Sequence, residues 1–271
     1  MPPNRSGRDD GAHLCGGGAV KGTLMIGLLA VTSLSADPAW AQCAADALGT
    51  SRTLTLKREP AAYGVPQHAA LPLAAGEVVI TFDDGPRPES TPRVLAALRQ
   101  QCVRATFFML GDAMARNPAL ARQVRAEGHS TALHSDTHAH PASQSAAEQL
   151  ADLAAVQKAY RRAFDVDAPA WRFPFLEETP TLTDALKAQA ITIMSVDLSI
   201  DDWLPDQSPR VLADRLVERL AHVGRGIILM HDAQDQTADA LPLLLATLKS
   251  HGYRVVHLEW EPGLPARTPR P

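Results

Sequence analysis

The sequence predicts an α/β fold, namely a distorted or incomplete (β/α) barrel of about seven parallel strands. Apolar runs of strand length alternate along the chain with stretches whose apolar residues have helical spacing. Helix start and stop signals, such as Asn117-Pro118 and Gly128, bound several of these stretches. A length of 271 residues suits one such domain. A doubly wound open sheet is the alternative.

The individual elements follow from these runs. Seven strands are expected, at Glu77–Phe82, Val103–Met109, Ser130–Leu133, Ala170–Phe173, Ile191–Val196, Gly226–Met230 and Arg254–Leu258. Six helices are expected between them, at Thr91–Gln100, Pro118–Glu127, Ala146–Phe164, Leu182–Gln189, Pro209–His222 and Asp239–Ser250. Strands separated by helices of this length pair in parallel through right-handed crossovers.

The first 41 residues have the pattern of an export signal. Basic residues precede a short apolar run at 24–31, and a small-residue site follows at 39–41. The run is far shorter than the roughly 20 residues that span a bilayer. We expect cleavage before Gln42 and a periplasmic or secreted product without stable membrane insertion. A disordered leader, or a start at Met25, is the alternative.

Three further segments follow the signal. Residues 42–75 are rich in Ala, Pro and Gly and are expected to form an extended N-terminal arm. Residues 76–260 contain the strand and helix pattern of the predicted barrel domain, and residues 261–271 are expected to form a flexible Pro-rich tail. The formal net charge of -4 and the pI of about 6.2 give no basic field for a nucleic acid.

The cysteines are consistent with export. Cys15 precedes the apolar run and would leave with the signal, so Cys43 and Cys102 would form an even pair in an oxidising compartment. A disulfide between them would tie the mature N-terminus to the barrel. Two unrelated thiols are the alternative, because buried cysteines are common.

Chemically active side chains follow several predicted strands, and active sites of parallel barrels lie at these ends. Asp83 and Asp84 are adjacent carboxylates, which repel each other unless a cation or a shared proton relieves them. His134 and His138 are four residues apart and can converge on one metal. With Asp84 they make a two-His, one-carboxylate set that suits Zn²⁺ or another divalent transition ion. An ordinary turn and a chance His pair are the alternatives.

Three later segments add further groups. Arg172 lies near the end of the fourth strand and would orient a nearby carboxylate. His231 ends the sixth strand and, placed opposite a metal, would be a general acid. Asp197 and Asp202 lie in an acidic stretch after the fifth strand, although such stretches are often solvated surfaces or helix caps.

Five segments resemble, in order, the motifs of the polysaccharide deacetylases, carbohydrate esterase family 4, also called the NodB homology domain. They are Thr81–Gly85, His134–His138, Arg172–Phe175, a stretch ending at Asp202-Trp203, and Leu229–Asp232. The resemblance spans residues 76–258. It implies a distorted barrel that uses one divalent metal, usually Zn²⁺ with Co²⁺ or Ni²⁺ as alternatives. It also implies hydrolysis of acetyl groups on an N-acetylated polysaccharide or oligosaccharide, such as peptidoglycan, a chitin-like glycan or a biofilm glycan.

The resemblance also assigns roles to residues. It implies a catalytic base at Asp83 held by Arg172, a general acid at His231, metal ligands at Asp84, His134 and His138, an oxyanion-binding backbone N–H at Phe175, and an acetyl pocket shaped by Trp203 and Leu229. Asp197 or Asp202 would pair with His231 or Arg172. The third motif departs from the family, since Phe175 and Leu176 stand where Tyr and Gly are common.

Other functions are compatible with the same fold. A related hydrolase could cleave a cyclic amide or imide, and an O-acetyl xylan esterase would use the same groups on an ester. A catalytically inactive glycan-binding module would lack a base or a metal ligand, and the sequence lacks neither. The oligomeric state is left open.

Overall fold

A computed structural model of the protein describes residues 43–65 and 67–261. The predicted signal, its cleavage site, Cys15 and the predicted tail beyond Glu261 lie outside these residues. The strands are β1 (Thr50–Leu56), β2 (Ala62–Tyr63), β3 (Glu77–Asp83), β4 (Thr106–Met109), β5 (Ser130–Leu133), β6 (Ala170–Trp171), β7 (Thr192–Met194), β8 (Leu198–Ser199), β9 (Gly226–His231) and β10 (Arg254–Trp260). The helices are α1 (Thr91–Gln100), α2 (Gly111–Arg116), α3 (Pro118–Ala126), α4 (Ala146–Phe164), α5 (Pro180–Ala188), α6 (Pro209–Val223) and α7 (Asp235–Ser250).

The strands form an incomplete parallel barrel. From β3 the sheet continues through β4, β5, β6 and β7 on one side and through β9 and β8 on the other, and each of these pairings is parallel. Within the described residues no pairing joins β7 to β8, so the sheet does not close. This confirms the predicted fold class. β10 pairs with the start of β3, and β1 pairs with β10.

Strand side chains alternate between the barrel interior and the surrounding helices, as the period of two requires. On β3, Val78 and Ile80 join the core that faces the helices, whereas Val79 joins a separate interior cluster. Thr81 and Asp83 continue the Val79 face toward the C-terminal end of the strand. The buried members of the interior cluster are Leu56, Leu71, Leu73, Val79, Phe108, Ala132, Ala170, Met194, Ile227, Val256 and Leu258. Arg172, Asp83 and Thr81 lie beyond this apolar cluster, at the C-terminal ends of the strands, and all three are buried.

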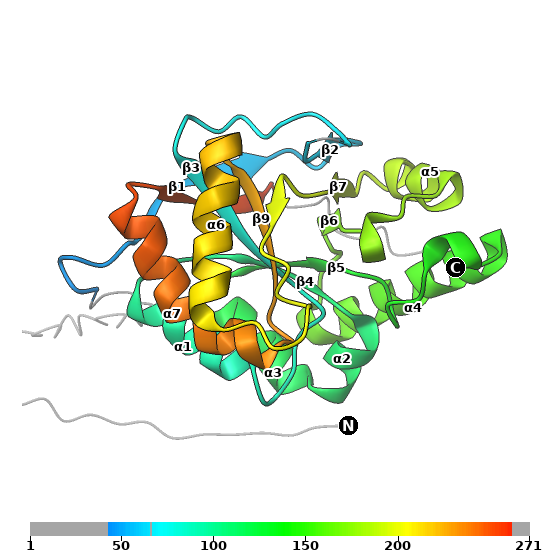
Figure 1. Ribbon diagram of the computed structural model, residues 1–271. Helices are drawn as coiled ribbons and strands as arrows, with labels where there is room; N and C mark the ends of the chain where they lie inside the picture. Colours follow the sequence, from blue (N-terminus) through cyan, green and yellow to red (C-terminus); the bar gives the residue numbers. More distant parts are fainter. Residues whose placement is uncertain (1–42, 66, 262–271) are drawn as a thin grey trace, which may run out of the picture. The chain divides into compact units, whose positions relative to one another are not determined.

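The helices pack outside the strands, with α6 beside α7 and α7 beside α1 (Figure 1). Their ends agree with the sequence signals. The Ser145 hydroxyl and the Glu148 carboxylate form a capping box at the start of α4. Pro118 and Pro209 occupy the first position of α3 and α6, and Gly224 ends α6 in the left-handed region with φ 70°. In the part of the chain that the structure describes, no helix is long and apolar enough to cross a membrane.

Four described strands and α-helices were not expected, and several predicted bounds differ by up to four residues. α2, β2 and β8 are too short to produce a readable period, and α7 begins four residues before the predicted Asp239 because its first turn is polar. The predicted arm also contains β1, in which side chains alternate between half-buried and exposed positions. The segment 42–75 therefore contributes strands to the sheet.

The predicted disulfide is present in the structure. Cys43 and Cys102 are bonded, with their Cα atoms 5.9 Å apart and a sequence separation of 59. In the chain-entropy model, closing a loop of this length stabilises the folded protein by about 4 kcal/mol. The bond fixes the segment before β1 to the turn after α1.

Two buried histidines lie near the start of β5 and on β10. His129 is 3% exposed and its Nδ1 accepts a hydrogen bond from the Ala105 N–H at 3.1 Å. His257 is 2% exposed and its Nε2 lies 3.3 Å from the Ser130 hydroxyl. Burial lowers the pKa of His129 to about 3 and that of His257 to about 4, with nearby positive groups acting in the same direction. Both imidazoles are therefore neutral in the folded protein at neutral pH.

These histidines should make the fold sensitive to acid. Their folded pKa values lie below the unfolded value of about 6.5, so the unfolded chain binds protons first and stability falls as pH drops from about 6.5 toward 4. For His257 alone the loss should be on the order of 2 kcal/mol at pH 4.5. The measurement is urea unfolding across this range. His257→Gln should show a shallower pH dependence than wild type, whereas the exposed control His251→Gln should match wild type. Parallel curves for wild type and His257→Gln would contradict the assignment.

Candidate active site

A buried arginine organises the C-terminal end of the barrel. Arg172 is 0% exposed, and its Nη1 donates to Asp83 Oδ1 at 2.7 Å and to the Thr81 hydroxyl at 2.8 Å. Its Nε donates to Met194 O at 3.1 Å and its Nη2 to Ser195 O at 3.2 Å. Burial lowers the pKa of the guanidinium, and the charge of Asp83 opposes that shift. The predicted contact between Arg172 and Asp83 is thus present, with the carboxylate also buried.

Asp84, His134 and His138 converge on one point, as expected from their spacing. Asp84 Oδ1 lies 3.5 Å from His134 Nε2 and 3.4 Å from His138 Nε2. The ligand atoms of the three residues all lie within 4.8 Å of one another. His134 Nδ1 donates to Arg172 O at 2.9 Å, so Nε2 presents its lone pair toward the carboxylate.

This set fits a divalent transition ion. Asp84 Oδ1 is buried and has no hydrogen-bond partner, which is costly unless a cation binds it. Burial, with the neighbouring charge of His134, lowers the pKa of His138 and favours the neutral imidazole that a metal requires. Two neutral imidazoles and one carboxylate are donors typical of Zn²⁺ and related ions.

The backbone around this set is held in an uncommon conformation. Asp84, Ser135 and His138 have φ values of 75°, 69° and 61°, in the left-handed region that residues other than glycine seldom adopt. The Ser135 hydroxyl accepts a hydrogen bond from the His138 N–H at 2.9 Å and stabilises the second of these turns. Such strain concentrates at functional sites.

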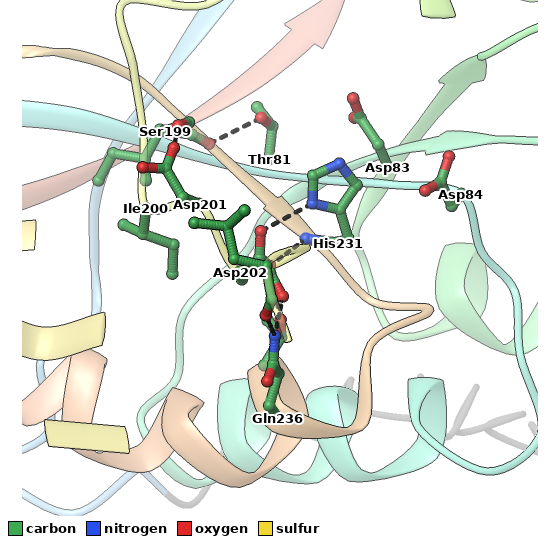
Figure 2. A network of polar contacts seen from close by, with 12 residues as sticks. Thr81, Asp83, Asp84, Ser199, Ile200, Asp201, Asp202, His231 and Gln236 are labelled. Atoms are coloured by element: carbon green, nitrogen blue, oxygen red, sulfur yellow. Dashed lines mark hydrogen bonds and ion pairs between the residues drawn. The ribbon is translucent and has the colours of Figure 1, made fainter. Parts of the chain in front are cut away.

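His231 lies between its carboxylate partner, Asp202, on one side and Asp83 and Asp84 on the other (Figure 2). Its Nδ1 lies 2.8 Å from Asp202 Oδ1, and its backbone N–H donates to Asp202 Oδ2 at 2.7 Å. Thr237 also donates to Oδ2, at 2.5 Å. Burial lowers the pKa of His231, but the hydrogen bond to Asp202 and the surrounding carboxylates outweigh it and raise the pKa to about 9. His231 is therefore a proton donor at neutral pH.

A second network holds the loop that bears Asp202 (Figure 2). Gln236 Nε2 donates to Asp202 O and, at 2.7 Å, to Leu204 O. The neighbouring Asp201 has a φ of 52° and accepts from Arg219 Nη1 at 2.8 Å. The same Arg219 nitrogen donates to Ser199 O at 2.6 Å. The position of Asp202 is thus fixed from α6 and α7.

The structure does not bring Asp197 to His231. Asp197 Oδ1 accepts from the Val65 N–H and Oδ2 from the Ile227 N–H, both at 2.7 Å. Its carboxylate packs against Gly226, where a Cβ atom would overlap it. Of the two aspartates predicted as partners, Asp202 holds His231, and Asp197 bonds to the backbone nearer the start of β9.

The three predicted substrate contacts also lie near these groups. Leu229 is 7% exposed and lies two residues before His231, on the same face of β9. The Trp203 ring is half-exposed and meets the His231 ring edge-on, with centroids 5.5 Å apart. Phe175 is also half-exposed and has a φ of 55°. Its backbone N–H donates to no acceptor among the described residues.

One important residue received no role from the sequence. Asp232 is 1% exposed, and Gly85 is required beside it because a Cβ there would overlap the carboxylate. Burial, joined by the charges of Asp84 and Asp83, raises the pKa of Asp232 to about 7. Thr91 donates to its Oδ2. Asp232 thus supports the turn that follows Asp83. Its position directly after His231 was the sequence feature that could have predicted a role for it.

The chain is similar in sequence to known proteins. A family model described as polysaccharide deacetylase matches residues 71–194. The chain is 36% identical over 190 residues to a peptidoglycan-N-acetylglucosamine deacetylase of Bacillus cereus, covering 66% of this chain and 84% of that protein. It is 35% identical over 195 residues to a chitin deacetylase of Colletotrichum lindemuthianum, covering 67% of this chain and 77% of that protein.

A solved structure agrees with this similarity. The peptidoglycan deacetylase of Bdellovibrio bacteriovorus matches with a TM-score of 0.69 and 31% sequence identity, over 77% of this chain and 58% of that one. The family model covers the strand ends that bear Asp83, Asp84 and His134. The chain therefore belongs to the polysaccharide deacetylase family.

Proposed function

We propose that this protein removes the acetyl group from the nitrogen of an N-acetylated glycan by metal-assisted hydrolysis. One observation supports this most directly. The Asp84, His134 and His138 donors converge beside a buried carboxylate, Asp83, and face an imidazole, His231, that holds its proton at neutral pH. A base, an acid and a metal-ligand set in one place are the groups that amide hydrolysis needs.

Each group has a step that its surroundings favour. A divalent ion held by Asp84, His134 and His138 would polarise the acetyl carbonyl and acidify water. Asp83, held by Arg172, takes the proton of the attacking water. The Phe175 N–H, which has no acceptor in the described chain, donates to the developing oxyanion. We propose Zn²⁺ as the ion, with Co²⁺ or Ni²⁺ as substitutes.

His231 completes the reaction. An amine leaves an amide readily only when it is protonated, and His231 donates that proton from Nε2 because its Nδ1 is bonded to Asp202. Trp203 and Leu229 border this side of the site and would contact the acetyl methyl group. No covalent intermediate is required.

The relatives suggest the substrate class, and the disulfide suggests the compartment. Two of them are named as deacetylases of peptidoglycan and chitin, so we propose a β-linked N-acetylglucosamine polymer or oligomer as substrate. We also propose that residues 1–41 are an export signal and that the mature protein is periplasmic or secreted. The bond between Cys43 and Cys102 supports this, because disulfides persist in oxidising compartments.

Acetate release tests the function. Purified protein should release acetate from chitin oligomers or peptidoglycan, lose activity to a chelator, and regain it with Zn²⁺ or Co²⁺. Elemental analysis should find about one divalent transition ion per chain at this three-ligand site. Acetylated xylan and a cyclic imide serve as comparison substrates. Full activity of metal-free protein on the imide, with none on the glycans, would overturn the proposal.

Changing each of the two adjacent aspartates to asparagine should impair a different property, turnover in one case and metal affinity in the other. Asp83→Asn should retain the metal and lose turnover by about 10²–10⁴-fold, since it removes proton transfer but leaves an oxygen for Arg172. Asp84→Asn should weaken metal affinity, with activity partly recovered at high Zn²⁺. His231→Ala should keep the ion and lose turnover. Metal content is measured beside turnover for each variant. Loss of the ion in Asp83→Asn with retention in Asp84→Asn would reverse the two roles.

The general acid should produce an alkaline limit in the pH profile. Activity should fall as pH rises through about 9, where His231 loses its proton. Asp202→Asn removes the carboxylate that raises this pKa, so the limit should move to lower pH by about one unit or more. Asp201→Asn is the matched control, because Asp201 pairs with Arg219 instead. An unmoved alkaline limit in Asp202→Asn would contradict the role of His231.

A further inference from the structure

The segment 174–178 has a conformation that its own sequence does not favour. Phe175 and the following Leu176 have φ values of 55° and 57°, and each is a non-glycine residue in the left-handed region. Such residues cost about 1–3 kcal/mol each and persist only where the surroundings hold them. Phe175 is 50% exposed, so burial of its ring in the core does not hold it. The restraint must come from specific contacts.

One restraint comes from His140, which follows the metal-ligand pair. Its ring stacks on the ring of Phe175 with centroids 3.6 Å apart and an interplanar angle of 8°. Its Nδ1 lies 3.0 Å from Glu177 Oε1. The His140 imidazole therefore contacts both Phe175 and Glu177, the residues on either side of Leu176.

A second restraint comes from the N-terminal part of the chain. Gln67 Nε2 donates to Leu176 O at 3.0 Å, and Gln67 Oε1 accepts from the Ser195 hydroxyl. His68 Nε2 lies 2.5 Å from Glu178 Oε1. Ser195 is also the residue whose carbonyl binds Arg172. Gln67 thus ties the segment to the strand end on which the buried arginine is anchored.

We propose that three positioning residues, His140, Gln67 and His68, hold the segment 174–178 so that the Phe175 N–H points at the acetyl oxygen. Gln67 and His68 precede residues 71–194, which the family model matches, so these two restraining residues are not part of the matched region. The inference rests on the proposed function, because it assigns the N–H to the oxyanion. A donor that acts on developing charge affects turnover more than substrate binding.

The test compares His140→Ala and Gln67→Ala with the exposed control His251→Ala. Hydrogen exchange should accelerate at the amides of Leu176 and Glu177, which bond to Phe173 O and Pro174 O. The kcat should fall about 10-fold to 10²-fold, less than the loss of a whole oxyanion donor. KM and Zn²⁺ affinity, the latter measured by chelator competition, should not change. His251→Ala should leave all four quantities unchanged.

Two further variants separate positioning from general damage. His140→Phe keeps the stacked ring without the bond to Glu177 and should recover part of the lost kcat. The double variant His140→Ala/Gln67→Ala should cost less than the two single losses combined, because both act on one segment. Thermal unfolding monitored by circular dichroism checks that each variant folds.

The outcomes decide the inference independently of the proposed function. If wild type releases no acetate from any glycan, the proposed function fails, while hydrogen exchange still shows whether these residues hold the segment. Unchanged exchange in both single variants overturns the inference. So does unchanged kcat with accelerated exchange, a rise in KM alone, or a loss of Zn²⁺ affinity, which would place the effect at His138.

Discussion

The site depends on one buried cation. The Arg172 guanidinium binds β3 through Thr81 and Asp83 and binds the end of β7 through two backbone carbonyls. The backbone carbonyl of Arg172 accepts a hydrogen bond from His134, directly after β5. The guanidinium charge lies 4.0 Å from the centre of the Phe108 ring inside the barrel. Removing one partner of such a buried pair typically costs about 3–5 kcal/mol, so strand-end geometry and chemistry are coupled through one side chain.

The carboxylates around this cation differ in how their charge is balanced. Asp83 forms an ion pair with Arg172. Asp202 pairs with the His231 ring and also accepts hydrogen bonds from the His231 N–H and the Thr237 hydroxyl. Asp232 is buried against the charges of its neighbours, and its raised pKa lets it carry a proton near neutrality. Asp84 Oδ1 and Asp232 Oδ1 are both buried without a hydrogen bond. The two differ in their surroundings, because Asp84 Oδ1 lies within 3.5 Å of two imidazole nitrogens, which together with it form a donor set for a cation.

Sequence patterns predicted the parts of the site that spacing controls. The strand ends, the two histidines and the pair Asp83 and Asp84 follow from apolar runs and fixed intervals. The choice between Asp197 and Asp202 could not be made, because both are acidic residues after one strand. β8 pairs in parallel with β9, so the chain that follows Asp197 runs alongside β9 toward His231. Asp202, five residues after Asp197, is therefore the aspartate that contacts His231.

The sequence was also silent on backbone conformation and on weakly patterned partners. Nothing in the residue types at His138, Phe175 and Leu176 indicates a left-handed φ. Gln67 and His140 contact the site region from segments without a catalytic motif. β1 was missed because exposed Thr and Ser obscure its alternation, and its partner β10 lies about 200 residues away in sequence. Contacts of this range depend on the completed fold.

The two ends of the described chain, which lead into β1 and follow β10, bear on how the protein can be attached to a support. Cys43 is bonded to Cys102, which precedes β4, and Trp260 donates to Thr192, the first residue of β7. Both ends of the described chain therefore lie near the N-terminal ends of the barrel strands, away from the candidate site at the C-terminal ends. A linker attached next to either of these ends would leave the candidate site facing away from the support.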